Sequence, residues 1–396
     1  MKRTVGTIVR GVRAPIVKQG EDIVNIVVES LMDVQKETGM VFNDRDIVGI
    51  TESIVARTQG NYAKVQDIAT DINNKFKGDS IAVVYPILSR NRFSLLLQGI
   101  AMSNKKIYLL LNYPSDEVGN SLMDIGLMDD SNVNPYTDVL TEAEYRKIFG
   151  AEVKHPFTGI DYVAYYKSLA TNDNIEIILA NDPRVALKYS KDVLVANIHE
   201  RHRTKKILKN NGANMVLSLD EILNAPVNGS GYNPESGLLG SNKATEDSVK
   251  LFPRDCQAVV DAIQMELLKK TGKNIEVLVY GDGAFKDPVG HIWELADPVV
   301  SPGYTKGLAG QPNEIKIKYI ADTELKDLKN EELVKAMRER ILTKEQDLTA
   351  SDASLGTTPR QLTDLLGSLC DLTSGSGDKG TPIVFIQGYF DNYASE

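Results

Sequence analysis

Two segments of the sequence combine residue types that can bind phosphate and a divalent cation. A glycine-rich stretch near the C-terminus lies between an expected helix and an expected strand, and consists of Ser374, Gly375, Ser376, Gly377, Asp378, Lys379 and Gly380. Its backbone N–H groups could turn inward and hold phosphate oxygens. Asp282 and Asp287 flank a turn after an apolar strand, where two carboxylates could hold Mg²⁺ or Mn²⁺ against phosphate. Each pattern alone also occurs as an ordinary flexible or solvated turn.

Other reactive residue types do not form a recognisable site. His199, Glu200 and His202 lack the His-Glu-x-x-His spacing that places two imidazoles on one helical face, so they favour the start of a surface helix. Cys256 and Cys370 are the only cysteines and lie far apart, which predicts neither a disulfide framework nor a zinc site. Neither cysteine has the sequence signature of a nucleophile.

The composition limits the partners of the protein. The chain has 396 residues, 42% of them hydrophobic and 25% charged, and 45 Lys and Arg against 54 Asp and Glu give a net charge of −9. These values are typical of a globular protein with more than one domain. The sequence contains no long basic block, so nucleic acid is not an expected partner. Residues 1–15 resemble neither a signal peptide nor a membrane span, and we expect a cytoplasmic protein.

The elements that must position these groups alternate between strands and helices. The apolar pattern and the Gly and Pro breaks predict strands at 4–12, 46–56, 81–85, 107–111, 175–179, 193–198, 215–217, 275–280, 315–320 and 382–387. They predict helices at 22–39, 68–76, 93–102, 203–209, 256–270 and 331–342, and another that begins at Thr358 and Pro359. Residues 114–135 and 224–242 are expected to be loops.

Several segments, in their order along the chain, resemble the coenzyme F420-0:L-glutamate ligase family. Ala14–Asp22 is similar to the family's Leu-Pro-Leu-Ile-Lys-Glu-Gly-Asp-Asp opening, and 46–60 is similar to its second strand. Gly231–Gly237 looks like the Gly-Ile-Asp-x-Ser-Asn loop, and 267–282 looks like the Thr-Gly-Lys and Thr-Asp-Thr segment. Residues 365–384 resemble the glycine-rich nucleotide loop, although the family's metal-binding Glu is absent from it.

The resemblance implies roles for individual residues. It implies nucleotide binding by Ala14, Pro15, Ile16, Val17, Glu52, Ser53, Arg57, Ser236 and residues Ser374 to Gly380. It implies metal binding by Asn233, in the place of the family's Asp, and by Asp282, and the acids Glu235, Asp287 or Asp378 could compensate for the altered ligands, so the expected metal ligands are Asn233, Glu235, Asp282 and Asp287. Arg57 and Asp282 are the candidate catalytic residues. Convergence of Asn233, Glu235, Asp282 and Asp378 with Arg57 on one cleft is therefore expected.

The resemblance also implies a fold and a reaction. The expected fold is α+β, with a ligase-like domain from 1–86 and 224–396 and an inserted α/β lobe at 87–223. The implied reaction uses GTP or ATP, with Mg²⁺ or Mn²⁺, to activate a small-molecule carboxylate that then forms an amide with L-glutamate. A homodimer is expected, in part because apolar strand edges such as Val277–Tyr280 need covering. Ligation of another carboxylate, such as a folate or cell-wall precursor, and a catalytically silent nucleotide- or metabolite-binding protein remain alternatives.

Overall fold

The chain folds into two compact units. The computed structural model describes residues 4–156, 158–281, 284–286, 293–295, 301–348, 351–354, 360–374 and 377–395. The first unit comprises Met1–Val55, Asp255–Gly283 and Val299–Glu396, and the second comprises Ala56–Arg254 and Ala284–Pro298. Both units mix helices and strands, as expected. The described part of the chain contains no helix that is long and apolar enough to cross a membrane.

A mixed five-stranded sheet forms the centre of the first unit. The order across the sheet is β1 (Ile8–Val12), β16 (Ile383–Gln387), β2 (Ile47–Thr51), β12 (Glu276–Tyr280) and β15 (Gly303–Tyr304). β2 and β12 run parallel, whereas β16 runs antiparallel to both β1 and β2. Strand β12 therefore lies inside the sheet, so the expectation that Val277–Tyr280 forms an uncovered edge is wrong.

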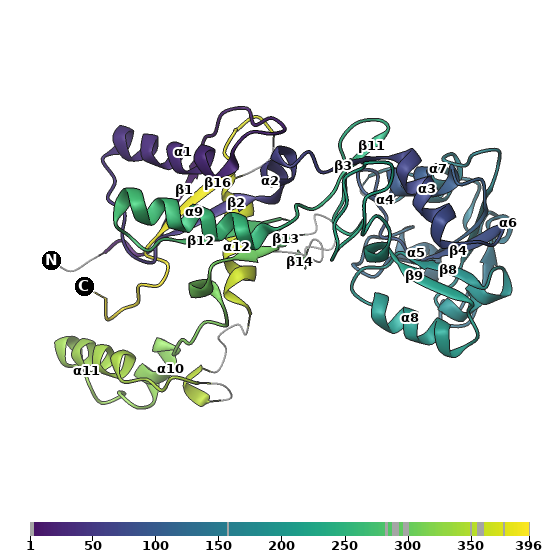
Figure 1. Ribbon diagram of the computed structural model, residues 1–396. Helices are drawn as coiled ribbons and strands as arrows, with labels where there is room; N and C mark the ends of the chain where they lie inside the picture. The colour runs from purple at the N-terminus through teal and green to yellow at the C-terminus, as the bar shows by residue number, and fades with distance from the viewer. Residues whose placement is uncertain are drawn as a thin grey trace. The chain divides into compact units, whose positions relative to one another are not determined.

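Alternating side chains bury both faces of this sheet, as the two-residue period of a strand requires. One face packs against α1 (Ile23–Thr38) and α9 (Cys256–Thr271), which lie side by side (Figure 1). The other face packs against α12 (Leu362–Ser374). Asp22 caps α1 by accepting hydrogen bonds from Val24 and Asn25, and Gly39 ends the helix with a φ of 69°. A separate small apolar cluster joins α10 (Ile317–Asp322) and α11 (Asn330–Leu342).

A six-stranded sheet forms the centre of the second unit. Its order is β6 (Leu140–Thr141), β7 (Ile175–Leu179), β5 (Lys106–Leu111), β4 (Ser80–Val84), β8 (Asp192–Val195) and β9 (Met215–Ser218). All neighbours are parallel except β6 and β7. The parallel strands begin at the centre with β4, extend outward to β5 and β7, and then cross back to β8 and β9, which is the arrangement of a doubly wound nucleotide-binding fold.

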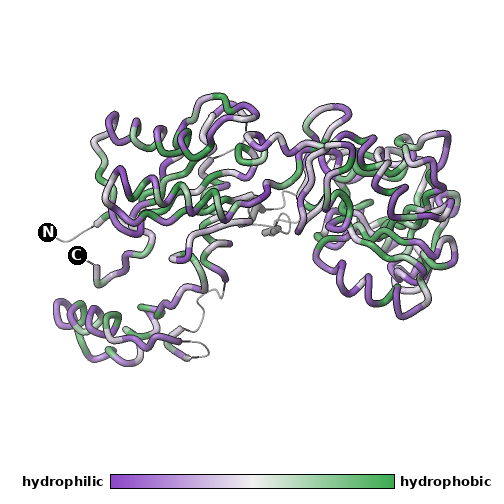
Figure 2. Tube along the Cα trace, viewed as in Figure 1, coloured by the Kyte–Doolittle hydropathy of each residue, from purple (hydrophilic) through white to green (hydrophobic). Residues whose placement is uncertain are grey.

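Helices cover both faces of this second sheet. One face packs against α3 (Val65–Lys75), α4 (Phe93–Ala101), α6 (Glu142–Phe149) and α7 (Tyr162–Lys167). The other face packs against α8 (Arg201–Asn210), which is largely hydrophilic along its length (Figure 2). The unit also contains α5 (Ile125–Asp129), β13 (Ala284–Lys286), β14 (Trp293–Leu295) and the three-stranded sheet of β10 (Asn242–Lys243), β11 (Ser248–Lys250) and β3 (Tyr62–Lys64).

Two predicted strands differ from the structure. The second strand ends at Thr51, and the chain continues as helix α2 (Glu52–Thr58), while the strand predicted at 315–320 is mostly helix α10. The expected domains, 1–86 with 224–396 and an inserted lobe at 87–223, stay a prediction. The two compact units divide the chain at 55/56 and 254/255. The physical reason is that α3 shares the apolar core of α4, and β4 is the central strand of the second sheet.

Candidate functional site

The register of the first sheet places one end of each of four strands at the same end of the sheet. Val12 at the end of β1 pairs with Ile383 at the start of β16, and Ile383 pairs on its other side with Ile50. Thr51 at the end of β2 pairs with Tyr280 at the end of the parallel strand β12. The segments that follow β1, β2 and β12, and the segment that precedes β16, therefore all leave the sheet at this end.

Hydrogen bonds join these segments to one another. The N–H of Ala14 donates to the carbonyl of Gly380 at 3.2 Å, and the N–H of Thr51 donates to the carbonyl of Pro382 at 3.0 Å. The Thr381 hydroxyl donates to the carbonyl of Ser374 at 2.6 Å, which links the end of α12 to the start of β16. We call the group formed by residues 14–17, 51–53 and 377–382 the strand-end loops.

The strand-end loops contain most of the nucleotide-binding residues that the resemblance implied. Pro15 and Ile16 are exposed and Ala14 is half-buried, whereas Val17 points into the core with 5% exposure. Asp378 and Lys379 are exposed. Gly377 and Gly380 have φ values of 82° and 67° with open space around them, so glycine is required by the backbone conformation of this turn. Gly375 and Ser376 lie outside the described residues.

Helix α2 contains the three remaining candidates of the second segment. Glu52 is buried and Ser53 is half-buried in its first turn, and Arg57 is exposed in its last turn. Arg57 belongs to the second compact unit, whereas Asp378 belongs to the first. Convergence of Arg57 with the strand-end loops therefore stays a prediction.

Asn233 has a structural role in the second unit. Its Nδ2 donates to the carbonyls of Phe252 at 3.3 Å and Pro253 at 3.1 Å. Its Oδ1 accepts from the N–H groups of Glu235 at 3.0 Å and Ser236 at 2.9 Å. Because these four bonds use both donors and both acceptor positions of a carboxamide, the observed side chain does not fit a metal ligand.

The other metal candidates are not brought together by the described structure. Glu235 is exposed and Ser236 is buried beside Asn233, while Asp282 and Asp287 lie outside the described residues. Within the described ranges, no three side chains of His, Cys, Asp or Glu gather closely enough to hold a metal ion. The metal site expected from Asn233, Glu235, Asp282 and Asp287 thus stays a prediction, and Asn233 argues against it.

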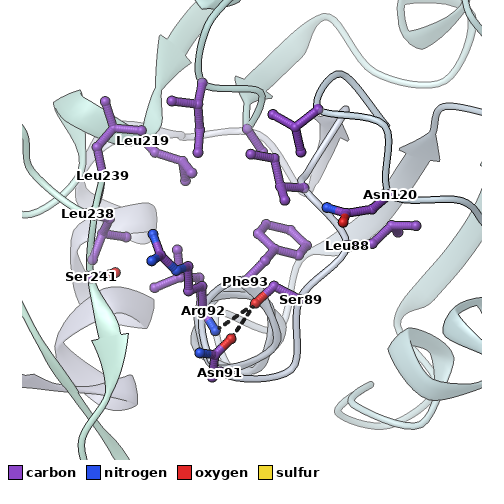
Figure 3. Close-up of a pocket in the computed structure, with 16 residues that line it drawn as sticks. Leu88, Ser89, Asn91, Arg92, Phe93, Asn120, Leu219, Leu238, Leu239 and Ser241 are labelled. Carbon is purple, nitrogen blue, oxygen red and sulfur yellow. Dashed lines mark hydrogen bonds between the residues drawn. The ribbon is translucent and has the colours of Figure 1, made fainter. Parts of the chain in front are cut away.

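A cavity in the second unit lies beyond the carboxyl ends of the central strands. It has a volume of about 310 Å³ and is lined by the segments that follow β4, β5, β8 and β9, and by residues 238–241. The parallel strands β4 and β8 are neighbours, but the chain continues from β4 to β5 on one side and from β8 to β9 on the other. Such a switch point is the usual ligand position in this class of sheet. Figure 3 shows the residues around the cavity.

Two neighbouring acids fix the walls of this cavity. Asp116 accepts hydrogen bonds from the N–H groups of Leu88 at 2.8 Å and Asn120 at 2.9 Å. Burial raises the pKa of Asp116, and these hydrogen bonds oppose that increase in part. Glu117 accepts from the N–H groups of Ile198, His199 and Glu200, just before α8. The protein's own carboxylate therefore occupies the position where a ligand phosphate would meet this helix.

Comparison with known proteins identifies the chain. A model of the family described as F420-0:Gamma-glutamyl ligase matches residues 11–388. The chain belongs to this family. Membership implies γ-glutamyl amide ligation of F420-0, a GTP-dependent ligase reaction. The match of this ligase family extends across 87–223, the segment expected to be an insertion. A search of curated proteins found no similar sequence.

Sequence reasoning missed the cavity and the role of Asp116 and Glu117. These residues fall in the segment 114–135, which the sequence predicts to be a loop without a function and which also contains the short helix α5. The available signal was two acids shortly after the buried strand β5. Their importance depends on β4 and β8 being neighbours of each other in the sheet, which local sequence patterns do not specify.

Proposed function

We propose that the strand-end loops of the first unit bind the phosphates of GTP for γ-glutamyl ligation. The observation that supports this is the meeting of segments 14–17, 51–53 and 377–382, which are remote in the sequence and each resemble a nucleotide-binding segment of the family. The left-handed glycines expose backbone in the turn that precedes β16. Backbone N–H groups in such turns are suited to phosphate oxygens.

The proposed chemistry requires no protein nucleophile. A carboxylate oxygen of F420-0 attacks the γ-phosphorus of GTP, GDP leaves, and an acyl phosphate forms. The amine of L-glutamate then attacks the acyl carbon, inorganic phosphate leaves, and the nitrogen loses a proton as the amide forms. The protein contributes by aligning the reactants and by stabilising the negative charge of the transferring group. Lys379, which is exposed in the strand-end loops, is a suitable cation for this second task.

A divalent cation, Mg²⁺ or Mn²⁺, is part of the proposal. GTP carries up to four negative charges and the protein is already acidic, so a cation is needed to offset the negative charge at the site. Asp282 is a proposed protein ligand on the strength of the family resemblance, and Asp287 is proposed beside it because the two acids are close in the sequence. Asn233 is left out because its carboxamide is already fully hydrogen-bonded. We also propose a homodimer, since the resemblance implies nucleotide sites near a two-fold interface.

Two glycine variants test the nucleotide site. Gly380→Ala places a side chain on a residue with a φ of 67°, and Gly212→Ala does the same at a φ of 87° in the second unit, with open space at both positions. Both changes strain the backbone by about 1 kcal/mol. Only Gly380→Ala should weaken binding of a fluorescent GTP analogue, by about tenfold, because it alters the turn that holds phosphate.

The comparison of the two variants separates binding from stability. Titration of the fluorescent analogue and a thermal melt would be measured for both proteins. Equal affinity in Gly380→Ala and the unmodified chain, or an equal loss in both variants, would refute the assignment of the strand-end loops.

A further inference from the structure

We propose that the cavity of the second unit binds a small organic anion, a compact apolar or aromatic body with one carboxylate. This inference is independent of the nucleotide site, because every residue that lines the cavity belongs to the second unit. Its volume of about 310 Å³ is at the lower end of the range of ligand pockets. That size suits a small metabolite better than a dinucleotide.

The walls of the cavity are mostly apolar. Phe93 and Leu96 come from the start of α4, Val118 comes from the loop after β5, and Leu238 and Leu239 come from the segment before β10. Phe93 is 3% exposed and its ring packs edge-on against the buried Tyr166, with centroids 5.6 Å apart. This support holds the apolar wall in place in the absence of ligand, as expected of a preformed site.

The polar groups of the cavity favour an anion. Arg92, half-buried immediately before α4, is the only ionisable side chain among the described residues that line the cavity. The Ser89 hydroxyl accepts from the N–H of Arg92 at 3.1 Å and donates to Asn91 at 2.8 Å, which fixes the turn that presents Arg92 (Figure 3). The cation and the N-terminus of the nine-residue helix α4 both attract negative charge.

A buried hydroxyl group is a second observation, independent of Arg92, that indicates a ligand in the cavity. Ser241 lines the same cavity, is 2% exposed, and its Oγ has no hydrogen-bond partner among the described residues. A buried hydroxyl without a partner is costly and therefore rare. A carboxylate in the cavity that accepts from Ser241 and from Arg92 would satisfy it.

The groups on the other side of the cavity, before α8, do not favour a ligand with several phosphates. The N–H groups of Ile198, His199 and Glu200 are bonded to Glu117, so a second anionic group at this position would meet a carboxylate. The crevice therefore offers one anion position, on the side of β4 and α4.

The test uses the full chain and a pair of probes of equal shape. We expect 4-fluorobenzoate to bind with one molecule per chain, as measured by fluorine NMR titration, and 4-fluorobenzamide to bind about tenfold more weakly because it lacks the charge. Equal affinities for the two probes, or no binding of the benzoate at millimolar concentration, would overturn the proposal. This comparison needs no variant, so it does not depend on the folding of any mutant.

Four variants locate the site. Arg92→Gln should lower benzoate affinity about tenfold and leave benzamide affinity unchanged, and Ser241→Ala should lower benzoate affinity about fivefold. Val118→Trp should abolish binding by filling the cavity, since Val118 is half-buried on a loop and can be enlarged without disturbing a strand or helix. Arg203→Gln removes the same charge from the exposed surface of α8 and should change nothing. Undiminished binding in Val118→Trp would place the ligand elsewhere and overturn the assignment.

Discussion

Replacement of Asn233 by Asp distinguishes a structural residue from a metal ligand. The resemblance places Asn233 where the family has a metal-binding Asp, so Asn233→Asp restores the family's residue. In the structure, however, Nδ2 of Asn233 donates to the carbonyls of Phe252 and Pro253, and the side chain is 7% exposed. The carboxylate of Asn233→Asp would keep the bonds from Glu235 and Ser236 but would face two carbonyl oxygens without a proton to donate.

The expected cost follows from the bonds that are lost. Two buried hydrogen bonds contribute roughly 1 kcal/mol each, and a negative charge placed against two carbonyl oxygens adds to the loss, so Asn233→Asp should destabilise the second unit by about 2–4 kcal/mol. The melting temperature should fall by roughly 5–10 °C for a unit of this size. Lower pH should reduce the loss, because a protonated carboxyl regains one donor.

Thermal unfolding monitored by circular dichroism, with and without Mn²⁺, measures this effect. Glu235→Gln is the matched control, because it changes one exposed carboxylate on the same loop and should shift stability by no more than about 0.5 kcal/mol. The reasoning would be refuted if Asn233→Asp were as stable as the unmodified chain, or if Mn²⁺ stabilised Asn233→Asp but not the unmodified protein.

Three further predictions address the cation, the pH dependence and the assembly. Asp282→Ala should weaken calorimetrically measured GTP binding in Mn²⁺ by about 2 kcal/mol, and an unchanged or metal-independent affinity would remove Asp282 from the site. Burial alone would raise the pKa of Asp161, but the Arg146 guanidinium, at 2.5 and 3.0 Å, and two backbone N–H groups lower it overall. The ion pair therefore contributes stability above the ordinary carboxyl pKa of 3.8, and this contribution is lost as pH falls through the lowered value. Denaturant titration should show Asp161→Asn destabilised by about 3 kcal/mol at pH 7 and by less in strong acid, and a pH-independent difference would contradict this. Light scattering at micromolar concentration should give the mass of a dimer, and a monomeric mass would contradict the proposed assembly.

Local patterns predicted most of the elements. The helical spacing of apolar residues, the cap at Asp22 and the glycine at 39 gave α1, and the apolar run after Lys273 gave β12. The same reasoning failed at 52–58, where polar residues after a buried strand begin a helix. It also failed at 315–320, where the predicted strand is mostly helix α10, which packs against α11. Short apolar segments fit both the helical period and the strand period, and tertiary packing decides which of the two structures forms.

The sequence by itself determined the family, the glycine turn at 377–380 and the alternation of strands and helices, because each can be recognised from short segments and from their order along the chain. Only the tertiary structure decided that β16 lies between β1 and β2, which brings residues 14–17, 51–53 and 377–382 to one end of the sheet. It also decided that Asn233 holds two distant carbonyls, and that β4 and β8 are neighbours with a cavity beyond their ends. Such contacts join segments separated by many residues, and the burial of a shared core selects them.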